Sequence, residues 1–217
     1  ILVHDVLAQI WRHLKTKAAL DHGSAGELDR LLKSVAGGAV AYIRQDRPGI
    51  FSGRFAEIEQ RRLINLAREW LEAEKKRGYF TIAATEDKRS IRVGGLTLTT
   101  RLDRIDELAD GQRIIIDYKT QKPSINAMLG DRPEEPQLPL YLVCAEPDAV
   151  AVVFALVKTK GMGFVGIARD EDLLPGIKAF AESPQRKQYE SWTALIDSWR
   201  HSLETLAKGF SGGNASV

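Results

Sequence analysis

The sequence predicts an α/β fold, in which helices flank a mixed sheet of about five strands. The N-terminal part of the chain has apolar residues at helical spacing over residues 3–20, 26–45 and 55–77. Apolar runs of strand length, separated by turn residues, follow over residues 79–168. A chain of 217 residues with a hydrophobic content of 44% can bury one core, so we expect a single domain over residues 1–210.

The N-terminal helices are expected to fill residues 3–78. In the first of them Val3, Leu7, Ile10 and Leu14 recur at three- and four-residue spacing. His4 falls in the first turn of this helix. A histidine at such a place is most often structural or solvated, but neutral imidazole also binds transition metals such as Mn²⁺, and Mg²⁺ less well.

The sheet is expected to begin with strands over residues 79–85 and 88–93, with Glu86 between them. The pair Gly94-Gly95 favours a hairpin turn, because both glycines can adopt positive φ angles. This turn leads into residues 96–120, which predict two more strands. The sheet core is therefore assigned to residues 79–168.

Residues 96–120 organise the candidate site. The two strands in this stretch are joined by a polar turn at Ala109-Asp110-Gly111. Side-chain alternation places Asp117 and Lys119 on one face of the second strand. If Asp103 of the first strand pairs near Asp117, two carboxylates and an ammonium group converge. Two carboxylates at that distance repel each other, so they attract a divalent cation such as Mg²⁺.

A plainer interpretation of the Asp117-Tyr118-Lys119 tripeptide is a surface ion pair at a strand end, which is a common feature of proteins. Beside a metal, the same lysine could stabilise charge on a phosphate, or position and deprotonate a water molecule. The tripeptide alone does not decide between the two interpretations, whereas its combination with other motifs does.

Residues 121–136 are typical of a loop, and residues 137–146 predict a helix. Gln137 and Tyr141 lie one helical turn apart and share a face. Buried, they would support the core; facing the site, they could bind a phosphate. The remaining expectations are strands over 149–158 and 163–168, a short helix within 170–183, a final helix over 185–209 and a disordered tail over 211–217.

Four motifs occur in a defined order: His4 within Ile1-Leu2-Val3-His4, then Asp103, then Asp117-Tyr118-Lys119, then Gln137 followed four residues later by Tyr141. This order resembles the RecB-family branch of the PD-(D/E)XK nuclease superfamily. It is most similar to the C-terminal nuclease domains of AddB-like and RecB-like DNA repair proteins. The resemblance extends from His4 to about residue 168, which is most of the chain.

The resemblance implies a restriction-endonuclease-like core and a metal-dependent DNA nuclease, an exonuclease rather than an endonuclease, within a larger DNA repair or recombination protein. It implies Mg²⁺ or Mn²⁺ as cofactor, DNA as substrate, and a helicase domain or subunit as a candidate partner. By the same resemblance, the metal ligands are His4, Asp103, Asp117 and the backbone carbonyl of Tyr118. The catalytic residues it implies are Asp103, Asp117 and Lys119. The DNA-binding residues it implies are Gln137 and Tyr141, and Glu86 is a further candidate for the site.

Composition excludes several other classes. The single cysteine, Cys144, forms no disulfide within the chain and cannot supply the iron–sulfur cluster found in some members of the resembled family. The sequence has no signal peptide and no apolar run long enough for a membrane span, so we expect a cytoplasmic protein. It also lacks a Gly-rich phosphate-binding loop. The first residue is Ile1, so we expect an excised part of a longer polypeptide.

One alternative belongs to a different functional class. A nuclease fold can persist as a catalytically silent module that binds DNA or docks a helicase partner. The presence of Asp103, Asp117 and Lys119 together argues against this alternative. The net charge of +2 does not discriminate between the two, because a nucleic-acid-binding protein can concentrate its cations on one face.

Overall fold

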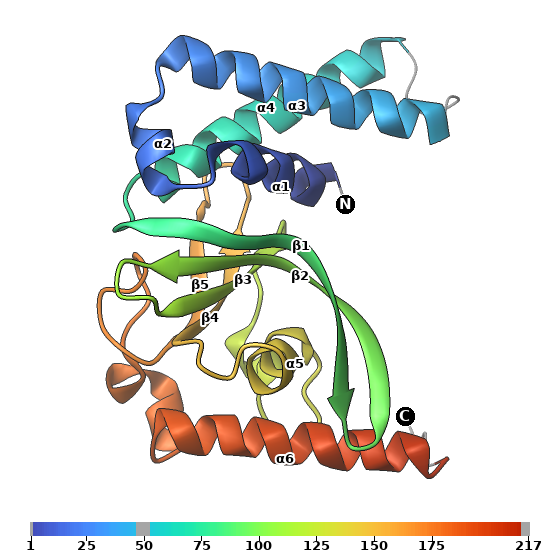
Figure 1. Ribbon diagram of the computed structural model, residues 1–217, viewed down its shortest axis with the longest axis vertical. Coiled ribbons are helices and arrows are strands. Elements are labelled where there is room, and N and C mark those ends of the chain that lie inside the picture. The colour runs from blue at the N-terminus through green and yellow to red at the C-terminus, as the bar shows by residue number, and fades with distance from the viewer. Residues whose placement is uncertain (1, 47–52, 214–217) are drawn as a thin grey trace.

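A five-stranded mixed sheet lies between two groups of helices in the computed structural model, which describes residues 2–46 and 53–213 (Figure 1). The strand order is β1-β2-β3-β4-β5, with β3 and β4 parallel and the other neighbours antiparallel. The predicted α/β fold class is therefore confirmed. The strands are β1 (Phe80–Val93), β2 (Leu96–Leu108), β3 (Arg113–Lys119), β4 (Ala151–Leu156) and β5 (Gly163–Ala168).

Four helices form the group above the sheet in Figure 1. The expected single helix over residues 3–20 is wrong, because the chain breaks at Lys15, which has a φ of 62°. The carbonyl of Lys15 accepts the N–H of Ile82 at 2.7 Å, so the break joins this helical layer to β1. The four helices are α1 (Leu2–Leu14), α2 (Lys17–His22), α3 (Ala25–Asp46) and α4 (Gly53–Glu74).

The first strand is continuous, so the expectation of separate strands over residues 79–85 and 88–93 is wrong. Glu86 adopts a φ of 50°, and the pairing with β2 shifts register between Ile82 and Ala84. These irregularities bend β1 without ending it. The β1–β2 hairpin then curves away from the sheet toward α6 (Trp192–Ser211) (Figure 1).

The tip of this hairpin requires the predicted glycines. Gly94 and Gly95 have φ angles of 51° and 90°. A Cβ atom on Gly94 would lie 2.6 Å from the Cβ of Ala207 in α6, a distance that real atoms do not tolerate. Gly94 therefore allows both the turn and the close approach of the hairpin to the last helix.

On the other side of the sheet lie α5 (Gln137–Cys144) and α6. The last helix begins later than expected because Ser191 caps it, its Oγ accepting the N–H of Ala194 at 3.0 Å. Short 3-10 turns occupy Ile125–Met128, Phe180–Glu182 and Pro184–Lys187. Of the expected disordered tail, Ser211 ends α6 and residues 214–217 lie outside the described residues, as does Arg47-Pro48-Gly49, the expected end of the second helix.

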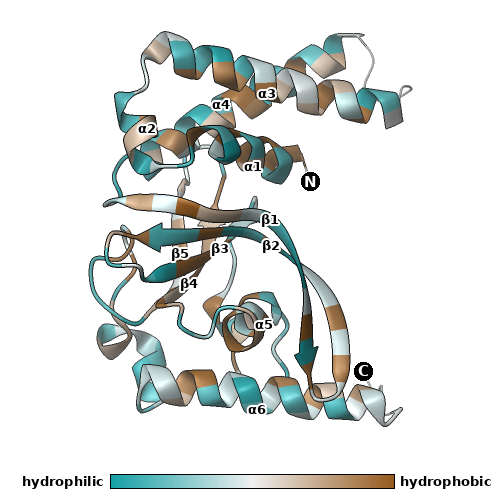
Figure 2. Cartoon of the chain, viewed as in Figure 1, coloured by the Kyte–Doolittle hydropathy of each residue, from teal (hydrophilic) through white to brown (hydrophobic). Residues whose placement is uncertain are grey.

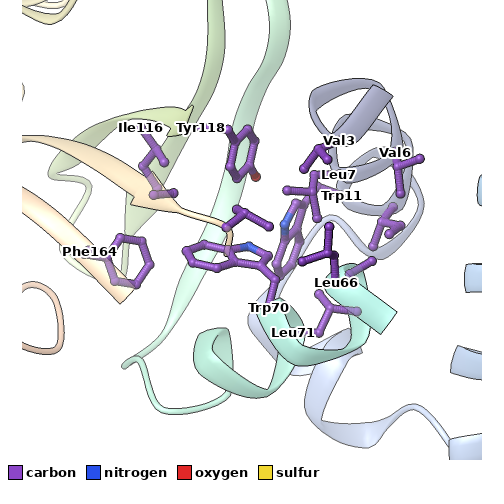
Figure 3. Packing of buried hydrophobic residues seen from close by; sticks show 14 of the residues in the cluster. Val3, Val6, Leu7, Trp11, Leu66, Trp70, Leu71, Ile116, Tyr118 and Phe164 are labelled. Atoms are coloured by element: carbon purple, nitrogen blue, oxygen red, sulfur yellow. The ribbon is translucent and has the colours of Figure 1, made fainter. Parts of the chain in front are cut away.

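Two apolar cores form on the two faces of the sheet because side chains alternate along its strands. In β4, Val153 packs toward α1, α3 and α4, whereas Val152 and Phe154 pack toward α5 and α6. The bands of brown and teal along α3 and α6 in Figure 2 match helices with a single apolar face. Figure 3 shows Trp70 of α4 and Tyr118 of β3 within the first core, with ring centroids 6.1 Å apart.

A buried ionic cluster lies within this first core. It consists of Glu74, Arg77, Arg104 and Asp106, all nearly or fully buried, so two cations face two anions. Arg104 contacts Glu74 and Asp106 at 2.6 Å each, and Arg77 contacts the same two carboxylates at 2.7 Å each. The Tyr118 hydroxyl accepts a hydrogen bond from Arg104 at 3.2 Å. The cluster therefore ties the end of α4 to β2 and β3.

Replacing Glu74 tests the importance of this cluster for folding. Glu74→Ala leaves a buried arginine charge without compensation, and we expect the free energy of unfolding to fall by roughly 3–5 kcal/mol. Urea unfolding followed by tryptophan fluorescence measures it. The matched control is Glu72→Ala, because Glu72 lies in the same helix but is exposed and pairs with Lys75 at the surface. We expect the control to lose less than about 1 kcal/mol; equal losses in the two variants would contradict the role of the cluster.

Candidate active site

The two predicted acids meet where two strands separate. The β2–β3 ladder runs from the pair Glu107–Arg113 to the pair Arg104–Ile116, so the next step places Asp103 opposite Asp117. Beyond this point β2 continues only along β1 and curves away from β3 (Figure 1). Asp103 and Asp117 are only 5% and 4% exposed, so two carboxylates are held at the edge of the core.

Asp103 is stabilised as an anion. Its Oδ2 accepts the backbone N–H of Tyr118 at 3.0 Å and lies 3.2 Å from Nδ1 of His4, in the first turn of α1. Burial alone raises the pKa of Asp103, but the contact with His4 and the bond from Tyr118 outweigh burial, so the pKa is lowered. The structure therefore brings His4, expected only from the order of motifs, into contact with the strand-end acids.

Asp117 lies in the opposite electrostatic situation. Burial, followed by the charge of Asp103, raises the pKa of Asp117 to about 6, although Lys119 acts in the other direction. Its Oδ2 is buried and accepts no hydrogen bond of acceptable geometry; the nearest cation is the Nζ of Lys119, at 3.3 Å. Buried oxygens without a hydrogen-bond donor are rare in proteins, and a bound cation would interact favourably with this one.

Lys119 is held between two carboxylates. Its Nζ lies 3.3 Å from Asp117 and 3.0 Å from Oε2 of Glu135, which belongs to the loop before α5. Partial burial lowers the pKa of Lys119, but these carboxylates outweigh it, so the pKa is raised. The ammonium form is thus favoured, and the arrangement supports charge stabilisation by Lys119 rather than deprotonation of a water molecule.

Gln137 and Tyr141 lie on the face of α5 next to these acids. The Gln137 amide donates to the Tyr141 hydroxyl at 2.9 Å, and that hydroxyl donates to the carbonyl of Arg101. Burial and the charges of Asp117 and Asp103 raise the pKa of Tyr141. The sequence left two roles open for these residues, support of the core and binding of a phosphate. The hydrogen bonds in the structure correspond to support, because Tyr141 is bonded to β2 two residues before Asp103.

Glu86, which has a φ of 50° in β1, also lies at the site. Its carboxylate lies 2.9 Å from Nε of Arg101. Burial, together with the charges of Asp103 and Asp5, raises the pKa of Glu86 against the effect of Arg101. The acidic group of the site therefore extends beyond the two strand-end residues.

Three residues at the site were not assigned from the sequence: Asp5, Arg101 and Glu135. Signals for two of them exist, since Arg101 shares the face of Asp103 by alternation and Glu135 lies in an acidic loop segment before the Gln137 helix. Asp5 offered no signal besides its position next to His4.

The site can be tested for its fit to a metal ion. Among residues 2–46 and 53–213, no group of three or more His, Cys, Asp or Glu side chains is arranged to hold one. The donors present are two buried carboxylates, one of them with an unbonded oxygen, beside an imidazole. Mg²⁺ usually takes one or two carboxylates and completes its shell with water and substrate phosphates, so this set of donors fits such an ion.

The pKa values of Asp103 and Asp117 shift in opposite directions, so replacing each acid should change the free energy of unfolding in opposite directions. Asp117 has a raised pKa in the folded state, so its ionisation costs stability as the pH rises from about 4 to about 6. In a chelator at pH 8, Asp117→Asn should therefore be more stable than the wild type, by roughly 1–3 kcal/mol. Below about pH 3 the difference should vanish, because Asp117 is then protonated in both the folded and the unfolded state.

Asp103→Asn is the matched control for this prediction. Because the pKa of Asp103 is lowered on folding, its anion contributes stability above its unfolded pKa, and this contribution is lost as the pH falls through its folded pKa. Asp103→Asn should thus be less stable than the wild type at pH 8. Urea unfolding at a series of pH values measures both variants, and destabilisation by Asp117→Asn at pH 8 would contradict the account of Asp117.

Residues 1–217 match the family profile described as the PD-(D/E)XK nuclease superfamily. No curated protein matches. Among solved structures, one titled "Crystal structure of SSO0001" is 18% identical over 75% of each chain, with a TM-score of 0.32, a likeness that carries no argument about this protein.

None of the helices formed by the described residues combines the length and the apolar character needed to cross a bilayer.

Proposed function

This chain belongs to the PD-(D/E)XK nuclease superfamily, and we propose that it is a metal-dependent deoxyribonuclease that hydrolyses phosphodiester bonds at the site of Asp103 and Asp117. One observation carries the proposal: two buried carboxylates face each other beside an ammonium group, and one of their oxygens has no hydrogen-bond donor. The buried anion of Asp117 costs folding stability, whereas phosphodiester hydrolysis uses such an arrangement.

In this proposal, Asp103, Asp117, the backbone carbonyl of Tyr118 and His4 would hold Mg²⁺ or Mn²⁺. When bound, the ion supplies activation of the attacking water and neutralisation of the departing oxygen. Asp103 is available as an anion at neutral pH because of its bonds from Tyr118 and His4.

Lys119 has a separate role in the proposal. Its ammonium group, beside Asp117, stabilises the negative charge that builds up on the phosphoryl oxygens in the transition state. Glu135 restrains the lysine from the loop side at 3.0 Å, and the short distance to Asp117 keeps it at the site. A preorganised cation of this kind needs no rearrangement as the reaction proceeds.

The proposal also includes the branch of the superfamily, the kind of protein that contains this chain and the mode of cleavage. We assign the chain to the RecB-family branch and to a DNA repair or recombination protein that works with a helicase, and we favour an exonuclease. The support is the order of His4, Asp103, Asp117-Tyr118-Lys119 and Gln137 with Tyr141 along the chain. Their proximity in the fold adds to it, since α1 and α5 approach the strand-end acids from different sides.

Lys119→Ala tests the mechanism. We expect single-turnover cleavage of DNA in Mg²⁺ or Mn²⁺ to slow by roughly 10²–10³, as loss of one charge-stabilising donor does. Affinity for DNA, measured in Ca²⁺, should fall far less, because one phosphate contact is a small part of the electrostatic binding. Lys119→Arg should restore little, since a planar guanidinium does not replace a compact ammonium.

The control for this experiment is Lys122→Ala, which removes an exposed lysine three residues away. It should leave cleavage unchanged. If Lys119→Ala cleaved DNA at the wild-type rate, Lys119 would be an ordinary ion-pair partner and the mechanism would be wrong. If the wild type bound DNA but cleaved none under any metal condition, the catalytically silent module would be the better description.

A further inference from the structure

A groove opens next to the candidate active site. It has a volume of about 580 Å³, within the range of about 300–1,000 Å³ typical of ligand-binding pockets. It lies between α1, α3 and the first two strands, and Glu86 and Arg101 belong both to its lining and to the site. The groove therefore adjoins the candidate site.

The groove is lined by charged residues of both signs. Asp5 and Glu86 supply its negative charges; burial raises the pKa of Glu86, and the charges of Asp103 and Asp5 add to this effect. Arg12 and Lys88 are exposed and, within the part of the chain that the structure describes, neither has a carboxylate partner. Arg12 is held in place by a hydrogen bond from its Nε to the Thr85 hydroxyl at 3.1 Å. Two uncompensated cations in a groove favour a polyanion.

Tyr42 adds an aromatic surface to this groove. Tyr42 is 74% exposed, more than any other large hydrophobic residue in the described part of the chain. It is located near the end of α3, which extends beyond the start of α1 (Figure 1). Gly38 and Ala39 line the groove beside it, and a Cβ atom on Gly38 would meet nothing within 4 Å, so the groove is open at this glycine. An exposed ring among cations is the arrangement on which unpaired bases stack.

We propose that this groove binds the single-stranded DNA next to the scissile phosphate, with a base stacked on Tyr42 and phosphates held by Arg12 and Lys88. The inference rests on the proposed function, because it takes the acids as the place of cleavage. A single strand is favoured over a duplex because the bases of a duplex already stack on each other and offer no free face to Tyr42.

Binding of labelled oligonucleotides tests the proposal. Fluorescence anisotropy in Ca²⁺, with an oligothymidine and a duplex of the same length, gives the two affinities. Tyr42→Ala should weaken single-strand binding by about 5- to 150-fold, which corresponds to one stacked base, and should leave duplex binding unchanged. Tyr42→Trp should restore it. Arg12→Gln should reduce the slope of log affinity against log salt by about 0.7, the value for one phosphate of a single strand.

The matched control is Tyr79→Ala. Tyr79 is also an exposed tyrosine, with 53% exposure, but it lies outside the groove. Single-strand binding should not change in this variant. The proposal would be overturned if Tyr42→Ala bound single strands with wild-type affinity, or if the two alanine variants lost the same affinity. It would also be overturned if the wild type bound no single strands, a result that favours another occupant such as a peptide.

A second measurement separates this inference from the proposed function. Hydrolysis of bis(4-nitrophenyl) phosphate by the wild type in Mn²⁺ needs the acids but not the groove. If this small diester is hydrolysed while Tyr42→Ala binds single strands normally, the nuclease stands and the groove assignment fails. If the diester is not hydrolysed but Tyr42→Ala loses single-strand binding, the groove stands and the catalytic proposal fails.

Discussion

Two buried carboxylates that face each other, Asp103 and Asp117, are the constraint on which this site depends. Like charges at such distance are unfavourable, and the surrounding residues stabilise them unequally. Asp103 receives a backbone N–H and the imidazole of His4, so its anion is favoured. Asp117 lies 3.3 Å from the ammonium group of Lys119, two residues further along the strand, and its pKa is raised to about 6 by burial and by Asp103. The asymmetry leaves one oxygen of Asp117 without a hydrogen-bond donor, and this oxygen is where a cation would be most stabilising.

The strand that carries Asp117 also anchors the site to the rest of the protein. Alternation sends Asp117 and Lys119 to one face of β3 and Tyr118 to the other. The Tyr118 ring packs against Trp70, and its hydroxyl meets the ionic cluster around Arg104, while its backbone N–H binds Asp103. One residue therefore links the buried cluster of the helical layer to the acid on the neighbouring strand. Rigid support of this kind keeps catalytic groups in position.

Some of this architecture could be predicted from the sequence because it follows from local rules. Side chains alternate along the apolar run that ends in Asp117-Tyr118-Lys119, so Asp117 and Lys119 must share a face. The pairing of Asp103 near Asp117 follows from the short turn between their strands. Other features depend on contacts that no local pattern encodes. β1 continues through a positive φ angle at Glu86, and the break at Lys15 is accompanied by a hydrogen bond from Ile82 of β1. Glu74 could not be distinguished in the sequence from the exposed acids of the same helix, because its partner Arg104 is 30 residues away.

The most direct test of the central claim is a calorimetric titration with Mn²⁺, comparing the wild type with Asp117→Asn and with Asp131→Asn, an exposed acid in the loop before α5. The wild type and Asp131→Asn should bind Mn²⁺ with the same affinity. Asp117→Asn should bind none at this site, although the variant remains folded. Binding of Mn²⁺ by Asp117→Asn with the affinity and stoichiometry of the wild type would contradict the assignment of Asp103 and Asp117 as a metal-dependent catalytic site.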